Sequence, residues 1–185
     1  MTNYTHLTRT LFALTLGVYT LLVSPKITLA ENLDNGVYIN INAGPGGQLS
    51  FDNLSGGLAS SLNVGYNFNT YLAIDVGINS LSALGTSGIN SSKIYTVAGK
   101  TSLPIGNIFY FYGRLGLGYE NSSYLNAWDG TNEYNAAVAL IAGGAAFHLG
   151  KHFELHLENS FFTPLNNQAP ATTTNMLQLG LQYNF

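Results

Sequence analysis

The chain contains no cysteine, and this absence excludes several kinds of chemistry. Without a thiol there are no disulfides, no thiolate nucleophile and no cysteine that could carry the lipid of a lipoprotein. Charge is also scarce, because Asp, Glu, Lys and Arg make up 8% of the residues, whereas a soluble domain has roughly 25%, most of it on the surface. Something other than charge must therefore cover the surface of the folded chain.

The one long apolar run lies near the amino end. It extends from Leu11 to Val23, follows Arg9 and precedes Thr28-Leu29-Ala30, which places small residues at both positions that specify cleavage. This order is typical of a cleavable export signal. We therefore predict that residues 1–30 are a signal peptide and that residues 31–185 form a single domain.

An uncleaved membrane anchor is the alternative for this run, but a spanning helix needs roughly 20 apolar residues, and Pro25 and Lys26 end the run earlier. Removal of residues 1–30 takes away two of the six Lys and Arg and none of the nine Asp and Glu, so the mature chain is acidic. This balance argues against nucleic acid as a partner. Gly (21), Tyr (12) and Phe (10) are plentiful while the mean hydropathy is only +0.14, which favours strands over membrane helices.

Eight segments alternate apolar and polar residues with a period of two, which is typical of β-strands. In the first, the odd-numbered residues from Val37 to Ala43 are apolar and the residues between them are polar, apart from one Tyr among Asn. The facing of the sixth is the least regular, with Ile141, Phe147 and Leu149 outward and His148 inward. The predicted strands lie at about 37–43, 61–68, 72–79, 93–103, 109–120, 134–149, 153–161 and 177–185.

The connections between these strands alternate in length. Short ones at 69–70, 104–107 and 150–152 separate longer polar ones near 44–57, 80–92, 120–133 and 164–173. Because an up-and-down barrel places alternate connections on opposite rims, we predict an all-β, eight-stranded antiparallel up-and-down β-barrel. It has a smooth rim, which carries the short turns and both ends of the mature chain, and a looped rim opposite. In outer-membrane barrels the smooth rim is periplasmic.

Residue type indicates which face of the strands points inward. The polar faces carry six charged residues among Gly, Ser and Asn, whereas the apolar faces carry almost no charge. Small residues and a few opposite charges suit the narrow lumen of a closed eight-stranded barrel, where the charges can pair. An outward apolar face is stable only in lipid. We therefore predict a transmembrane barrel with a lumen ion network made of Asp75, Lys100, Arg114, Glu120, Glu154 and Glu158.

Aromatic residues gather toward the two ends of the predicted strands, as interfacial girdles require. Seven lie near the smooth rim, namely Tyr66, Phe68, Phe109, Phe147, Phe153, Tyr183 and Phe185. Three lie toward the looped rim, namely Tyr95, Tyr119 and Phe161.

The carboxyl end resembles the β-signal of outer-membrane proteins. Gln178, Gly180, Tyr183 and Phe185 occupy the places of a polar residue, a glycine two positions on, and alternate aromatics that end in a terminal Phe. The resemblance implies that the barrel-assembly machinery reads these four residues during insertion, by strand addition to an exposed sheet edge.

The mature chain as a whole resembles the OmpA-like transmembrane domain and the related small opacity-type and OmpX-type surface proteins. The stretches Leu62–Phe68 and Gly113–Tyr119 and the inward Glu158 are similar to that family's pattern. The resemblance covers the barrel only. Since the chain stops at the β-signal, we do not expect the peptidoglycan-binding domain that tethers full-length OmpA proteins to the cell wall.

Two kinds of reactive site are disfavoured by spacing. His148, His152 and His156 suggest a metal site, but residues four apart on a strand are roughly 13 Å apart, and His152 lies in a predicted turn. A lipid A deacylase would need a Ser activated by His on the lipid-facing surface, whereas His156 and Ser160 share an inward face and are too far apart to bond. We therefore predict no metal site, no cofactor and no catalytic residues.

The function predicted from these features is that of an integral barrel of the cell outer membrane, with a structural or surface-interaction role and no chemistry of its own. A narrow passive pore and a loop-borne adhesin or immune-evasion protein are the alternatives, and a lipid A-modifying enzyme is the least favoured. The expected partners are outer membrane lipid and lipopolysaccharide, the barrel-assembly machinery during insertion, and an extracellular ligand at the loops. Trp128 is a candidate surface contact, although a lone loop Trp often packs on its neighbours.

Overall fold

The computed structural model describes residues 35–49, 54–83, 88–126, 130–165 and 173–185. The predicted signal peptide and Trp128 lie outside these ranges. Eight strands make up the fold: β1 (Gly36–Leu49), β2 (Leu54–Asn67), β3 (Leu72–Ala83), β4 (Gly88–Ile105), β5 (Phe109–Asn126), β6 (Gly130–His148), β7 (Phe153–Pro164) and β8 (Thr173–Asn184). None of the described residues forms a helix long and apolar enough to cross a membrane.

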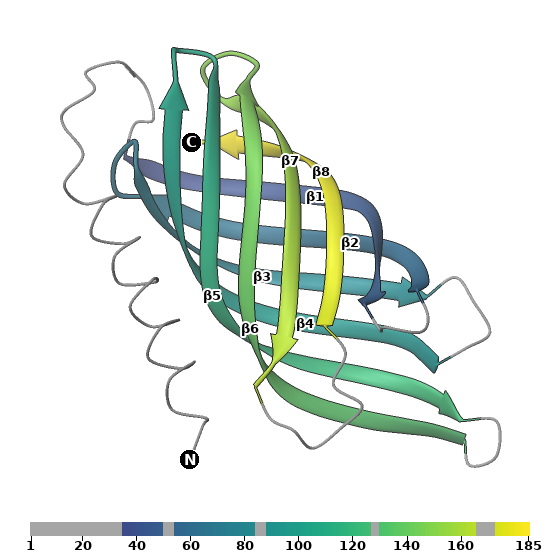
Figure 1. The fold of residues 1–185 in the computed structure, drawn as a ribbon. Coiled ribbons are helices and arrows are strands. Elements are labelled where there is room, and N and C mark those ends of the chain that lie inside the picture. The colour runs from purple at the N-terminus through teal and green to yellow at the C-terminus, as the bar shows by residue number, and fades with distance from the viewer. Residues whose placement is uncertain (1–34, 50–53, 84–87, 127–129, 166–172) are drawn as a thin grey trace, which may run out of the picture.

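The strands close into a barrel with the simplest order. Each pairs antiparallel with the next along the chain, and β8 pairs with β1 (Figure 1). The predicted eight-stranded up-and-down barrel is confirmed. The smooth rim consists of residues 68–71, 106–108 and 149–152. Its two glycines, Gly106 (φ 71°) and Gly150 (φ 132°), adopt positive φ angles that other residues rarely tolerate.

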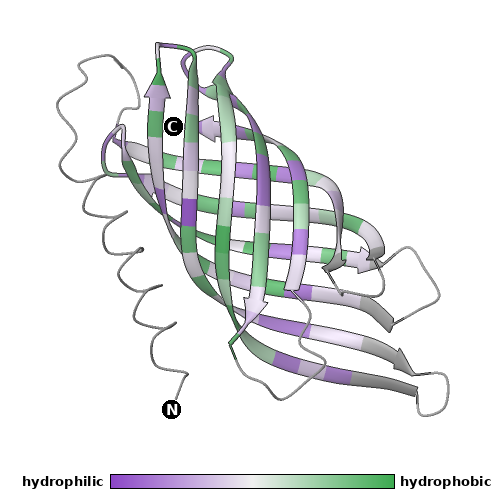
Figure 2. Ribbon diagram, in the orientation of Figure 1, coloured by the Kyte–Doolittle hydropathy of each residue, from purple (hydrophilic) through white to green (hydrophobic). Residues whose placement is uncertain are grey.

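The two faces of the strands differ as the alternation predicts. Apolar side chains such as Ile41 (61% exposed) and Leu117 (64%) point outward, whereas Asn, Ser and charged side chains are buried within the barrel. Figure 2 shows the resulting alternation of hydrophobic and hydrophilic bands along each strand. The facing of β6 follows the prediction too, with Ile141 outward and His148 partly buried.

The strands are longer than the alternation predicted, so several of the predicted strand ends are wrong. Ranges 44–57, 80–92 and 120–133 were expected to be loops. Instead, β1 and β2 stay paired up to Leu49 and Leu54, β4 begins at Gly88, and the paired strands β5 and β6 reach Asn126 and Gly130. At the smooth rim, Pro104 and Ile105 belong to β4 rather than to a turn. In Figure 1, the β5–β6 hairpin reaches farther out than the other strands at the looped rim.

The outward face changes character partway along these long strands, and the change explains the error. On β5 the outward residues are apolar or Gly from Phe109 to Tyr119, and the next two, Asn121 and Ser123, are polar. On β7 the mainly apolar stretch runs from Phe153 to Phe161. These ranges match the roughly 9–11 residues with which a tilted strand crosses a bilayer. The polar remainder of β4, β5 and β6 therefore stands beyond the bilayer as sheet, where an outward Ser or Asn faces water instead of lipid.

The seam between β1 and β8 closes the barrel and contains one irregularity. The pairing runs from Tyr38↔Asn184 to Ala43↔Leu179 and resumes at Gly46↔Met176, so it is interrupted at Gly44 and Pro45. Pro45 has no N–H to donate. A Cβ on Gly44 would lie 2.1 Å from the carbonyl oxygen of Leu177, so only glycine lets the two backbones approach this closely.

Candidate functional site

The six charged residues predicted to face the lumen all have buried side chains inside the barrel. They come from four strands: Asp75 from β3, Lys100 from β4, Arg114 and Glu120 from β5, and Glu154 and Glu158 from β7. The structure does not join them into one network. Three meet at Arg114, and the other three have separate surroundings.

Arg114 lies at the centre of the lumen between two carboxylates. Its Nη2 is 2.6 Å from Asp75 Oδ1, and its Nη1 is 2.8 Å from Glu158 Oε1. Nη2 also donates to Asn63, and the Tyr38 hydroxyl donates to Asp75. Because every partner is buried away from bulk solvent, the charges compensate one another, and losing one partner leaves the others uncompensated.

Glu154 forms a second cluster nearer the smooth rim. Its carboxylate accepts hydrogen bonds from Tyr110, from His156 Nε2 (3.1 Å) and from Asn184 Nδ2 (2.7 Å), and His148 Nδ1 lies 3.3 Å away. His148 belongs to β6, where it is paired directly with Glu154 across the sheet. The two histidines therefore lie on either side of one carboxylate, an arrangement that their spacing along the sequence did not indicate.

Lys100 is buried without a carboxylate partner among the described residues. Its ammonium group lies over the faces of three tyrosine rings, 4.6 Å from the centroid of Tyr112, 5.2 Å from Tyr38 and 5.5 Å from Tyr110. Aromatic faces attract a cation through their quadrupole. The lysine is thus held by cation–π contacts rather than by an ion pair.

The looped-rim half of the lumen is filled mainly by apolar side chains, which we call the apolar plug. They come from six strands and are Ala59, Leu81, Ile94, Ala98, Ala136, Val138, Leu140, Ala142, Phe162 and Met176. Glu120 lies at this end, where it accepts hydrogen bonds of 2.7 Å from both Ser92 and Ser122. The predicted polar lumen therefore describes the smooth-rim half, whereas the looped-rim half combines the apolar plug with Glu120 and buried hydroxyl side chains.

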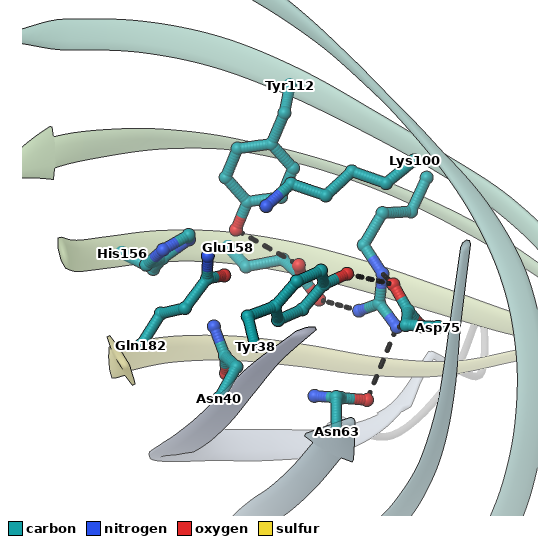
Figure 3. Close-up of a pocket in the computed structure, with 10 residues that line it drawn as sticks. Tyr38, Asn40, Asn63, Asp75, Lys100, Tyr112, His156, Glu158 and Gln182 are labelled. Carbon is teal, nitrogen blue, oxygen red and sulfur yellow. Dashed lines mark hydrogen bonds and ion pairs between the residues drawn. The ribbon is translucent and has the colours of Figure 1, made fainter. Parts of the chain in front are cut away.

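Side chains leave little space at the level of Arg114. A cavity of about 10 Å³, lined by Arg114, Lys100, Tyr38 and their neighbours (Figure 3), is the space between them. A cavity of this size holds about one water molecule. Within the ranges that the structure describes, no three His, Asp or Glu side chains converge in a way that could hold a metal ion.

The four residues of the predicted β-signal divide between the two faces of β8. Gln178 is inside, where its Oε1 accepts from Ser61, and Gly180 makes room for Asn42, whose Oδ1 would lie 1.6 Å from an added Cβ. Tyr183 and Phe185 are outside with their rings edge to face, 5.0 Å apart. Gly180 thus has a packing role in the folded barrel, whatever its part in recognition, which stays a prediction.

Sequence reasoning did not single out the tyrosines that surround Lys100 or the members of the apolar plug. Both sets were within reach of the two-residue alternation. Tyr38, Tyr110 and Tyr112 share a face with predicted polar residues, and Leu140 and Phe162 have the parity of inward positions. Their partners could not be found in this way, because contacts across the lumen depend on the register between strands.

The combination of a lipid-compatible exterior with a charged and packed interior defines an integral membrane β-barrel. The model of the outer membrane protein beta-barrel domain matches residues 14–185, and the chain belongs to this family. Membership places the protein in the cell outer membrane. A comparison with curated proteins finds no match.

Several solved structures have the same fold. Neisserial surface protein A superposes with a TM-score of 0.67 at 13% identity, covering 81% of this chain and 97% of that one. Ail, the attachment invasion locus protein of Yersinia pestis, has a TM-score of 0.61 at 15% identity, with 83% and 100% covered. The amino-terminal barrel of OprF from Pseudomonas aeruginosa has a TM-score of 0.58 at 14% identity, with 82% and 100% covered.

Proposed function

We propose that this protein is a closed, non-conducting barrel of the outer membrane that acts through the sheet and loops at its looped rim. The observation that carries the proposal is the filling of the lumen. Arg114 joins side chains of β3 and β7 across the barrel, and the apolar plug occupies the next level. An ion crossing the lumen would have to part buried ion pairs and then pass apolar side chains, which disfavours the passive-pore alternative.

The looped rim differs in charge from a surface that binds polyanions. A structure of Ail holds the heparin analogue sucrose octasulfate. In this chain, ranges 44–57, 80–92, 120–133 and 164–173 contain no Lys or Arg, and their ionised groups are Asp and Glu. The cation nearest to these ranges in sequence is Lys93, an exposed residue of β4 that directly follows range 80–92. The partner that suits this rim is therefore neutral or basic. Contact with lipopolysaccharide would then be made by the outward apolar side chains of the strands.

Planar-bilayer recordings test the closed lumen. We expect the refolded protein to insert without discrete conductance steps, while a general porin in the same bilayers gives them. Steps of reproducible size from the parent protein would overturn the proposal. Arg114→Lys keeps the charge but loses the fork that bridges the two carboxylates, so a change in step size with this variant would locate the conducting path in the lumen.

Two exposed lysines test the orientation. Lys93 is near the looped rim and Lys151 is in a smooth-rim turn. A membrane-impermeant amine reagent applied to intact cells should label Lys93 and spare Lys151, and both should react once the outer membrane is permeabilised. Preferential labelling of Lys151 would place the looped rim in the periplasm and remove the surface role. In the same samples, we expect the mature chain to begin at Glu31 and to fractionate with outer membrane.

A further inference from the structure

The cavity beside Lys100 is surrounded by polar atoms that do not contact one another. Asn40, His156 and Gln182 also line it (Figure 3), and all four side chains are at most 7% exposed. Asn40 Oδ1, His156 Nδ1 and Gln182 Oε1 are buried without a hydrogen-bond partner among the described residues. Buried polar atoms in folded proteins are nearly always satisfied by protein or by ordered water, so the orphaned acceptors of His156 and Gln182 in particular indicate a bound species.

Gln182 presents an acceptor to this space, because Glu154 fixes its orientation through Asn184. The Glu154 carboxylate can only accept when it is ionised, so Asn184 Nδ2 is the donor in their 2.7 Å hydrogen bond. Asn184 Oδ1 is then the acceptor from Gln182 Nε2, at 2.8 Å. The unpartnered atom of Gln182 is therefore its carbonyl oxygen.

His156 presents an acceptor for the same reason. Its Nε2 lies 3.1 Å from Glu154 Oε2 and donates to that carboxylate. In a neutral imidazole with a proton on Nε2, Nδ1 carries a lone pair. Two separate relays from Glu154 thus end in unpartnered acceptors, on His156 and on Gln182, in residues that line the cavity.

Lys100 supplies the complementary donors. Its ammonium group has three N–H bonds, and its contacts among the described residues are the three tyrosine faces. None of the acceptors on His156, Gln182 or Asn40 lies within hydrogen-bonding distance of it. Donors and acceptors therefore line one small space without meeting.

We propose that one internal water molecule is a constituent of this lumen, accepting a hydrogen bond from Lys100 and donating to Gln182 and His156. The volume of about 10 Å³ suits a single water. A halide ion can only accept, which would place its charge against lone pairs of Gln182 and His156. A metal cation would lie near the Lys100 ammonium, while the two carboxylates that line the cavity, Asp75 and Glu158, are already paired with Arg114. Water is the species that both accepts and donates.

Crystals of the refolded protein grown in rubidium bromide test this directly. We expect one density peak within about 2.7–3.2 Å of Lys100 Nζ, within the same distance of Gln182 Oε1 or His156 Nδ1, and without anomalous signal at the rubidium or bromine absorption edge. An anomalous peak in the cavity would replace the water with an ion and overturn the proposal. A direct bond from Lys100 to one of these acceptors, with no peak between them, would also overturn it.

A double-mutant cycle gives an independent readout in solution. Lys100→Met and Gln182→Leu each remove one partner of the same water, so their shifts in urea midpoint should be non-additive when combined. Gln178 is the matched control, because it is buried on the same face of β8 and does not line the cavity. Lys100→Met and Gln178→Leu should have additive shifts. Additivity in both pairs would show that no shared water couples Lys100 to Gln182. If a variant fails to fold, the crystals of the parent protein decide whether the water is present.

Discussion

Arg114 and Asp75 meet inside the barrel although β4 lies between their strands, with Nη2 2.6 Å from Oδ1 and Nε 3.2 Å from Oδ2. Arg114→Ala would leave the carboxylates of Asp75 and Glu158 buried and uncompensated, so we expect it to lower the free energy of unfolding by about 3–5 kcal/mol. Lys93→Ala removes an exposed charge and should change it by less than about 0.5 kcal/mol. Urea unfolding followed by the heat-modifiable gel shift measures both, and equal midpoints for the two variants would contradict the ion-pair account.

Phe162 and Phe161 are adjacent on β7 but belong to different environments, since Phe162 is in the apolar plug and Phe161 faces lipid. Phe162→Ala should lower stability by about 3–5 kcal/mol, because the cavity it leaves inside the barrel stays unfilled. Phe161→Ala should cost less, since lipid chains can occupy the vacated space. Unfolding in lipid bilayers compares the pair. A larger loss for Phe161→Ala would contradict the contribution of the apolar plug to stability.

Gly44 provides a test of the seam between β1 and β8. Gly44→Ala would drive a Cβ into the carbonyl of Leu177, and we expect it to destabilise the barrel by about 1–3 kcal/mol through overpacking. Gly99→Ala is the control, because the nearest atom to its added Cβ is 4.0 Å away; there a stabilisation of about 0.4–1 kcal/mol is expected from the stiffer unfolded chain. If Gly44→Ala unfolds at the same urea concentration as the parent, the backbones of β1 and β8 are not as close at Gly44 as the structure places them.

Deleting Phe185 should impair assembly in cells far more than the stability of barrel already folded. Phe185 is 68% exposed, and its N–H donates to the carbonyl of Val37 at 3.0 Å, so its loss removes one rim contact and a ring worth about 1.5–3 kcal/mol of burial. We expect the truncated chain to accumulate in the periplasm or to be degraded, yet to refold in micelles with the parent's gel shift. Parental levels of the truncated chain in the outer membrane would show that the terminal Phe is not read during insertion.

The alternation of residues was enough to predict the number of strands, their order and the face that meets lipid. It succeeded because one face of every strand contacts lipid, as from Leu72 to Ile78 on β3, and a shift of one residue would expose the wrong set. It failed where this constraint ends. Ser80 and Ser82 on β3, and Ser91 and Lys93 on β4, are polar where the apolar outward residues end, and a strand in water has the composition of a loop.

The candidate site was less accessible, because it depends on distances across the lumen. That Lys100 and Arg114 face inward follows from parity, but their different partners do not. Arg114 meets Asp75 and Glu158, whereas Lys100, its direct cross-strand neighbour, contacts tyrosine rings. His148 and His156 were judged by their separation along the sequence, whereas the pairing of β6 with β7 brings His148 beside Glu154.

The irregular seam at Gly44 and Pro45 has a consequence for how the barrel forms. Every other sheet contact joins strands that are consecutive in the chain, so seven hairpin pairings can grow locally, while Tyr38↔Asn184 joins the two ends of the barrel. Pairing β1 with β8 closes a loop of nearly the whole barrel, so this step has the largest loss of chain entropy. A seam whose pairing is interrupted at Gly44 and Pro45 should then be the slowest contact to form and the first to open, and unzipping of the folded barrel should begin between β1 and β8.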